Sequence, residues 1–282
     1  MPAMDIRPLE GVGAEITGVD LKALSRAEET AIRDAFAEQG VIFFRDQSFS
    51  EEDHIAFAQR FGQINVNRFF AAHPDYPQIA MVAKDVGDTD NIGGGWHTDH
   101  SYDEIPALGS VLVARELPET GGDTRFASMY RAYETLPDEL KRAVEGKRAI
   151  HSARHIFGGQ DDSYYSQSDA GRGRIGNADA VETLSDVAHP LIITHPLSGK
   201  KALFVNPAFT IGIDGMDEAA SKALLQKLFA HAMREEHTCR FKWEPGSVAF
   251  WDNRSTWHWA LNDYQGQRRV MHRITIEGEP LN

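Results

Sequence analysis

The alternation of apolar and polar positions predicts strands and helices in turn near the start of the chain. Residues 14–20 alternate between polar and apolar side chains, which is the period of a strand with one buried face. Ser25 and Glu28 have the spacing of a capping box, and apolar residues recur after them at helical intervals. This predicts a helix that ends at Gly40, followed by a buried strand over the apolar run 41–47.

The same patterns continue through the middle of the chain. A second helix is expected to begin after Ser50, to bury Ile55, Ala58 and Phe61, and to end at Gly62. Residues 76–85 and 107–116 are apolar and rich in β-branched side chains, which predicts two strands. A helical stretch over 128–146 is interrupted by a proline near its centre.

The C-terminal half predicts a long loop, a hairpin, one more helix and a final group of strands. Residues 158–180 are rich in Gly, Ser and Asp, which is typical of a long mobile loop within a domain. Residues 189–206 read as a hairpin with a Ser-Gly turn, and residues 217–233 as an amphipathic helix. Three or four strands are expected within 239–278. Strands at both ends with helices between them predict one α+β domain over residues 1–282.

Charge and composition exclude several classes of function. Lys and Arg number 29 against 42 Asp and Glu, a net charge of −13, which disfavours nucleic acid and anionic membranes as partners. The single cysteine, Cys239, excludes an intramolecular disulfide framework, and we expect no catalytic role for it. The first residues lack the pattern of a secretory signal, and no apolar run is long enough to span a membrane. We therefore expect a cytoplasmic protein.

The most informative chemistry lies in Trp96-His97-Thr98-Asp99, which follows three glycines. In an extended segment, residues two apart project from the same face, so an imidazole and a carboxylate can reach one point. A third ligand from elsewhere would complete a two-histidine, one-carboxylate set, which leaves coordination positions open on Fe(II). A lone His-x-Asp is common by chance, and the same ligands also hold zinc for hydrolysis.

A second group of functional residue types follows near the C-terminus. His258 is expected where a strand ends, and Arg269 and Arg273 share one face of a later strand. Two buried guanidinium groups need anions, and each matches a carboxylate in bidentate fashion. The alternative is an exposed basic strand, with the residues between the arginines forming the buried face.

In these blocks the sequence resembles the taurine and 2,4-dichlorophenoxyacetate dioxygenase family, which depends on iron(II) and 2-oxoglutarate. The resemblance runs nearly from end to end, in order and at fitting distances. It implies a double-stranded β-helix (jelly-roll) core with flanking helices. Its blocks are GAEITGVDL (13–21), WHTD (96–99), ELPETGGDTRFASMYRAYETLP (116–137), WDNRSTWH (251–258) and QRRVMHR (267–273).

The resemblance also assigns roles by position. It implies that the iron ligands are His97, Asp99 and His258. It implies that Arg269 pairs with the distal carboxylate of 2-oxoglutarate and that Thr124 hydrogen-bonds the same group. Arg273 corresponds to the residue that holds the anionic group of the prime substrate. The family chemistry then uses O2 and releases succinate and CO2.

The residues around these positions depart from the taurine enzyme. The sulfonate-binding histidine and nearby tyrosine of the taurine enzyme align with Asn67 and Phe70. Fewer polar side chains are therefore expected around the anionic group of the substrate, and taurine is disfavoured as the substrate. His100 and Tyr102 are expected to line the mouth of the pocket, and Phe209 to form one wall. For these three residues, ordinary packing is the alternative.

The sequence thus favours a dioxygenase that hydroxylates a small anionic substrate such as an aryloxyalkanoate, a sulfonate or a sulfate ester. Two alternatives remain at this point: a zinc hydrolase that uses the same three ligands, and a non-catalytic barrel that binds a small acid. Relatives form dimers or tetramers, so a homo-oligomer is expected by analogy.

Overall fold

The computed structural model describes residues 3–157 and 185–281, so the loop predicted over 158–180 lies outside the described residues. The strands are β1 (Asp5–Pro8), β2 (Ala14–Thr17), β3 (Val41–Phe44), β4 (Ile64–Asn65), β5 (Ala80–Lys84), β6 (Gly109–Glu116), β7 (Thr124–Ser128), β8 (Arg148–His151), β9 (Val187–Pro190), β10 (Ile192–Thr194), β11 (Lys201–Leu203), β12 (Thr210–Ile213), β13 (Thr238–Phe241), β14 (Val248–Asp252), β15 (Thr256–Ala260) and β16 (Arg269–Ile276). The helices are α1 (Arg26–Gln39), α2 (Glu51–Phe61), α3 (Met129–Glu134), α4 (Asp138–Val144), α5 (Arg154–Phe157), α8 (Glu218–Ala232) and the short 3₁₀ helix η2 (Glu235–His237).

An eight-stranded sheet is the largest element of the described part of the chain. Its strands run in the order β1-β2-β3-β14-β6-β16-β4, and β5 also pairs with β16. The strand β16 pairs with three neighbours, and its eight residues are all buried. Both of its faces are therefore covered, so it is not the exposed basic strand that the sequence left open as an alternative.

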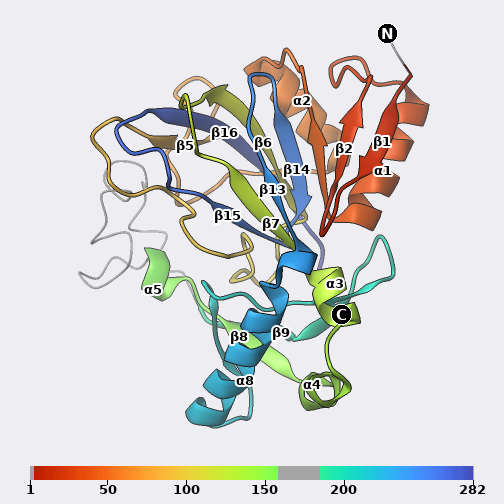
Figure 1. The fold of residues 1–282 in the computed structure, drawn as a ribbon, viewed down its shortest axis with the longest axis vertical. Coiled ribbons are helices and arrows are strands. Elements are labelled where there is room, and N and C mark those ends of the chain that lie inside the picture. Colours follow the sequence, from red (N-terminus) through yellow and green to blue (C-terminus); the bar gives the residue numbers. More distant parts are fainter. Residues whose placement is uncertain (1–2, 158–184, 282) are drawn as a thin grey trace.

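Helices α1 and α2 cover one face of this sheet (Figure 1). Phe36 of α1 stacks on Phe250 of β14 with ring centroids 4.0 Å apart, and Phe57 of α2 meets the same ring edge-on. A phenylalanine removed from water in this way contributes about 2–3 kcal/mol. This apolar layer fixes the sheet against its helices.

The opposite face of the sheet meets a second, three-stranded sheet in the order β13-β7-β15. Phe43 of β3 stacks on Phe241 of β13 at 4.1 Å and contacts Phe126 of β7 edge-on at 5.3 Å. Side chains of both sheets thus form one apolar layer between them. As a result, His258 on β15 and Arg273 on β16 come from different sheets.

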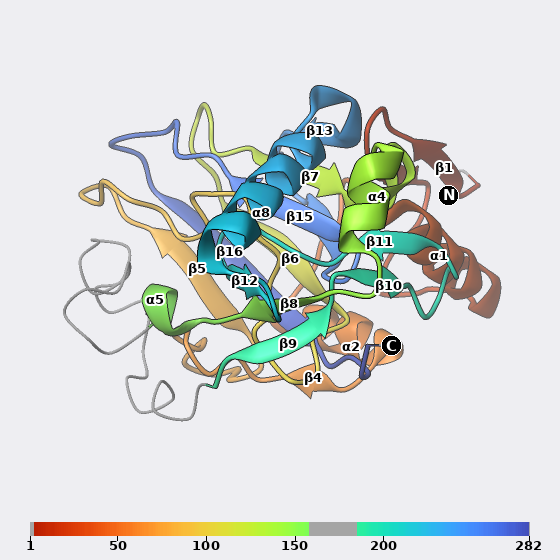
Figure 2. The same cartoon turned by 90° about the horizontal axis from the view of Figure 1, so that it is seen from below.

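A further group of helices and short strands packs beyond the two sheets. Helices α4 and α8 lie on the side that faces the viewer in Figure 2, over the strands β10, β11 and β12. Leu225 and Leu228 of α8 are buried in an apolar cluster with Trp257 of β15. None of the described helices has the length and hydropathy needed to cross a membrane.

Most of the predicted elements are present, with shifted boundaries. Ser25 and Ser50 both form capping boxes, and Gly40 ends α1 at a φ of 75°. The stretch 128–146 divides into α3 and α4, and the segment 239–278 contains four strands. The predicted buried face of α2 was partly wrong, because His54 and Phe57 are buried there with Ala58, whereas Ile55 and Phe61 are half-buried.

Candidate metal centre and active-site cavity

A backbone bridge brings the two predicted histidine ligands side by side. His97 and His258 exchange two backbone hydrogen bonds, of 3.1 and 2.8 Å, and their ring centroids are 4.1 Å apart. His258 lies in the middle of β15 rather than at a strand end, because Thr256–Ala260 pairs along its whole length with β7. Gly93 makes this approach possible, because a Cβ there would lie 3.2 Å from the His97 ring, and its φ is 77°.

The carboxylate of Asp99 completes the group. Its two oxygens lie 3.8 Å from Nε2 of His97 and 3.8 Å from Nε2 of His258, and the three ligand atoms are all within 4.8 Å of one another. Nδ1 of His97 lies 2.8 Å from the carbonyl of Gly95, which orients Nε2 toward the shared point. Three donor atoms therefore converge in a buried position.

The electrostatics of the three side chains suit a cation. Burial lowers the pKa of His97, and it lowers the pKa of His258 well below its usual value, so both imidazoles are neutral and carry a free lone pair. Burial alone would raise the pKa of Asp99, but the charge of the neighbouring Arg273 outweighs it and holds that pKa low. Neutral imidazoles and an ionised carboxylate are the forms that bind metal ions.

Arg269 offers a second binding function in the same cavity. Arg269 is 4% exposed, and its Nε and Nη2 have no hydrogen-bond partner among the described residues. Thr124 lines the same cavity, and its hydroxyl accepts a hydrogen bond of 2.9 Å from Nε1 of Trp243. A buried, incompletely paired guanidinium beside a hydroxyl fits the carboxylate of a small acid.

Arg273 lies four residues after Arg269 on β16 and faces the same cavity, as the spacing predicted. Its Nη1 donates to both oxygens of Asp99, at 3.1 and 3.0 Å, and its guanidinium lies 4.6 Å from the ring centre of Phe70. Nε and Nη2 have no partner among the described residues. Arg273 can thus bind an anion while it remains in contact with Asp99.

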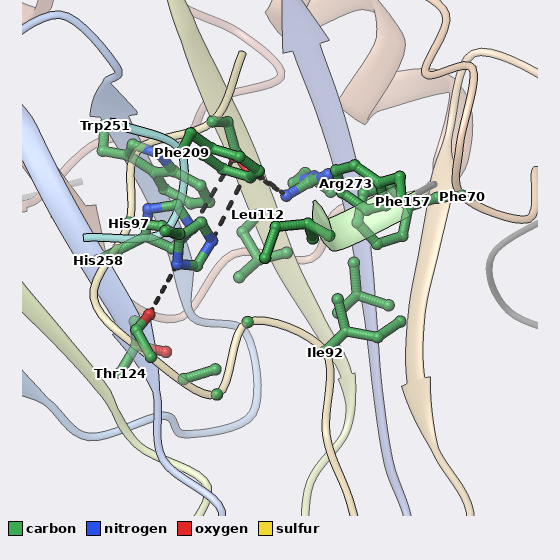
Figure 3. A pocket seen from close by; sticks show the side chains of 18 of the residues that line it. Phe70, Ile92, His97, Leu112, Thr124, Phe157, Phe209, Trp251, His258 and Arg273 are labelled. Carbon is green, nitrogen blue, oxygen red and sulfur yellow. Dashed lines mark hydrogen bonds and ion pairs between the residues drawn. The ribbon is translucent and has the colours of Figure 1, made fainter. Parts of the chain in front are cut away.

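The cavity that joins these groups has a volume of about 220 Å³ and mainly apolar walls. This space is several times that needed by one water and has room for a small organic molecule. Figure 3 shows His97 and His258 together on one side, with Arg273, Phe70 and Phe157 opposite them. Among the predicted substrate contacts, the cavity is lined by Phe70, Tyr102 and Phe209.

Two predicted substrate contacts do not line this cavity. The side-chain oxygen of Asn67 accepts hydrogen bonds from the backbone amides of Phe69 and Phe70, and its amide nitrogen lies 3.4 Å from Nε2 of His100. Nδ1 of His100 lies 2.8 Å from the carboxylate of Asp103. These two side chains shape the turns that carry Phe70 and Tyr102, and their polar atoms are already engaged there.

Several cavity residues were not predicted from the sequence. Among them are Val82, Ile92, Leu112, Ile156, Phe157, Ala208 and Trp251. Leu112 and Trp251 lie on strands whose two faces are both apolar, so their pattern does not tell the cavity face from the core face. For Phe157 the only local signal is its place in HSARHIFG, which carries no period that predicts a pocket wall.

Comparisons with known proteins agree with this arrangement. The family model described as taurine catabolism dioxygenase TauD, TfdA family matches residues 5–275. The alkylsulfatase of Acinetobacter baylyi is 35% identical over 98% of this chain and 86% of its own length. The (S)-phenoxypropionate/alpha-ketoglutarate-dioxygenase of Sphingobium herbicidovorans is 34% identical over 100% of this chain and 97% of its own.

Solved structures show the same likeness. The crystal structure of a taurine dioxygenase from Burkholderia xenovorans superimposes with a TM-score of 0.81 at 33% identity, and covers 99% of this chain and 92% of that one. The structure of AAD-2 in complex with Mn(II) and N-oxalylglycine gives a TM-score of 0.79 at 29% identity, with 99% of this chain and all of that chain covered.

Proposed function

The chain belongs to the taurine catabolism dioxygenase TauD, TfdA family of alpha-ketoglutarate-dependent oxidoreductases, and on this premise we propose that it is an Fe(II)-dependent dioxygenase that hydroxylates a small anionic organic substrate. The observation that carries the proposal is the convergence of His97, Asp99 and His258 beside Arg269, a buried arginine with unpaired donors. Two histidines and one carboxylate with open positions are typical of non-haem Fe(II) oxygenases.

When bound, the metal and 2-oxoglutarate supply the oxidising chemistry: one atom of O2 enters succinate as CO2 is released, and the other converts a substrate C–H bond to C–OH. The residues of the chain position the reactants. Arg269 and Thr124 hold the distal carboxylate of 2-oxoglutarate by charge-assisted and neutral hydrogen bonds. The apolar walls exclude water from the reacting groups.

The substrate class follows from the other end of the cavity. Arg273 binds the anionic group, and the rings of Phe70 and Phe157 contact an apolar body attached to it. Relatives that are named as an alkylsulfatase, a putative sulfonate dioxygenase and a phenoxypropionate dioxygenase support a sulfate ester, a sulfonate or an aryloxyalkanoate. Neither the zinc hydrolase nor the non-catalytic barrel receives support from these relatives.

We also propose that the facing sheets form the double-stranded β-helix core that the resemblance implied, that residues 1–282 make one domain, and that the protein is a homo-oligomer. The layer between the two sheets supports the first point, since Phe43 contacts residues of both β13 and β7. Sedimentation of the purified protein tests the last point, and a monomer at micromolar concentration would contradict it.

A substrate panel tests the proposed function. Aryloxyalkanoates, sulfate esters and sulfonates are offered with Fe(II) and 2-oxoglutarate, and O2 consumption is measured together with succinate release. We expect at least one anionic class to stimulate both in equal amounts, and the neutral amide of the same compound to be turned over far less well. Stimulation that does not depend on 2-oxoglutarate, or that zinc supports equally well, would contradict the proposal.

A further inference from the structure

A second group of metal-ligand side chains lies outside the cavity. Glu51, His73 and His272 each offer one ligand atom, and these atoms lie within 4.8 Å of one another. We call these three residues the outer cluster. They come from three separate parts of the chain: the first turn of α2, the segment before β5, and β16.

The alternation of β16 separates the outer cluster from the cavity. Successive side chains of a strand point to opposite faces, so His272 projects away from the face that carries Arg273. His272 pairs with Val113 of β6, whose side chain belongs to the layer under α1 and α2. The outer cluster and the candidate iron site therefore use opposite faces of the same strand.

The distances between ligand atoms of the outer cluster fit a metal ion with tetrahedral coordination. Two ligand atoms that are each about 2.1 Å from a zinc ion lie about 3.4 Å apart. Nδ1 of His272 and Oε1 of Glu51 are 3.4 Å apart. The rings of His73 and His272 have centroids 5.2 Å apart at an interplanar angle of 78°. A small rotation of the half-buried His73 side chain would bring its ligand nitrogen to the third position of the tetrahedron.

The hydrogen bonds of the two imidazoles show where the lone pairs are. Nδ1 of His73 accepts a hydrogen bond of 3.2 Å from the backbone amide of Asp75, and Nδ1 of His272 accepts one of 3.1 Å from Nε of Arg115. Each ring thus carries a lone pair on Nδ1, which is the form of imidazole that binds metal ions.

Arg115 is the group with which a metal ion would compete. Besides His272, its guanidinium approaches Oε1 of Glu51 at 3.5 Å. The same guanidinium also donates to the carbonyl of Phe49, so it keeps a partner when it gives up the other two. The exposed amide of Asp75 is solvated by water when it releases His73. The exchange removes the partner of Nε of Arg115, and Nη2 already has none among the described residues, so zinc binding must outweigh the cost of that unpaired donor.

We propose that the outer cluster binds Zn²⁺, with Glu51, His73 and His272 as ligands and a fourth position open to water. Two histidines and one glutamate are a ligand set that zinc uses in proteins. The ion joins α2, the segment before β5 and β16. That segment follows Phe70 and β16 carries Arg273, so bound zinc ties together two elements that form the substrate end of the cavity.

Counting zinc equivalents with matched variants tests this site. Zinc is titrated into the full-length protein against a chromophoric chelator, and its position is located by anomalous diffraction at the zinc edge. Glu51→Gln and His73→Gln each remove one ligand of the outer cluster. Glu52→Gln is the control, because it makes the same charge change in the same helical turn, and Glu52 contacts Tyr76 instead. His97→Ala removes a ligand of the candidate iron site.

We expect two equivalents for the wild type and for Glu52→Gln, and one for Glu51→Gln, His73→Gln and His97→Ala. Loss of a ligand should weaken the outer site by more than about 100-fold, since even outer-shell partners of ligands are worth about 10- to 100-fold. A protein with Glu51→Gln or His73→Gln that still binds as much zinc as the wild type would overturn the proposal, as would an anomalous peak away from the outer cluster. An unchanged count in His97→Ala alone would instead contradict the ligands of the candidate iron site.

Discussion

Replacing Arg269 by methionine should stabilise the protein and abolish its response to 2-oxoglutarate. The guanidinium of Arg269 is buried, and two of its nitrogens have no hydrogen-bond partner among the described residues. A buried unpaired donor costs about 1–3 kcal/mol. We take the lower value for each nitrogen, about 2 kcal/mol in all, because the substitution also removes the hydrogen bond of Arg269 with Tyr264. Methionine keeps the apolar stem without the unpaired donors.

Denaturant and thermal unfolding, with and without 2-oxoglutarate and Mn(II), measure both effects. For a domain of this size, about 2 kcal/mol corresponds to a rise in Tm of about 4 °C. The wild type should gain about 2.7 kcal/mol at a ligand concentration of 100 times Kd, and the variant should gain almost nothing from 2-oxoglutarate. A destabilised variant, or one that 2-oxoglutarate still stabilises, would refute the reasoning.

Arg254→Met is the matched control for this experiment. Arg254 is also fully buried, but its Nε and Nη2 donate to Asp252 at 2.9 and 2.6 Å. Breaking a buried pair leaves an uncompensated charge and costs about 3–5 kcal/mol. The two substitutions should therefore shift the free energy of unfolding in opposite directions.

Three further predictions concern the site and the fold. His97→Ala or Asp99→Ala should abolish succinate formation without changing the circular dichroism spectrum, and turnover that survives both would mean the ligands are wrongly assigned. Arg273→Ala should raise KM for the prime substrate by at least tenfold and change the 2-oxoglutarate requirement little, whereas the reverse pattern would show that the two arginines have exchanged roles. Burial lowers the pKa of His54 to about 3, while its ring bonds the carbonyl of Val111 at 3.1 Å. Because the unfolded state binds more protons than the folded state below about pH 6.5, the free energy of unfolding should be highest above that pH and fall toward pH 3. The contribution of His54 to this fall should be about 2 kcal/mol at pH 5. His54→Gln should flatten urea-unfolding stability over that range, and an unchanged slope would contradict the assignment.

The local chemistry of the site could be predicted from the sequence because it follows short-range periodicities. His97 and Asp99 are two residues apart in extended chain, and Arg269 and Arg273 are four apart on one strand, so each pair shares a face wherever the segment lies. The capping boxes at Ser25 and Ser50 depend only on four consecutive residues. These features need no knowledge of the tertiary fold.

The approach of His258 to His97, which is distant from it in the sequence, could not be derived from periodicity. His258 reaches His97 because β15 pairs with β7 and a backbone bridge then joins the two histidines. Long-range pairing of this kind leaves no mark in a local pattern, and only the family resemblance predicted it. The departure of Asn67 from the cavity has a similar cause, since its side chain caps a turn whose geometry the sequence did not show.

The most direct test of the central claim is an anaerobic titration of the protein with Fe(II) and 2-oxoglutarate, followed by visible absorption. If two imidazoles and a carboxylate hold the iron while Arg269 receives the distal carboxylate, the wild type should develop a charge-transfer band at one equivalent of each. The band should be absent in His258→Ala, and in Arg269→Met it should require far more 2-oxoglutarate. A wild type without the band, or an equally strong band in His258→Ala, would contradict the account.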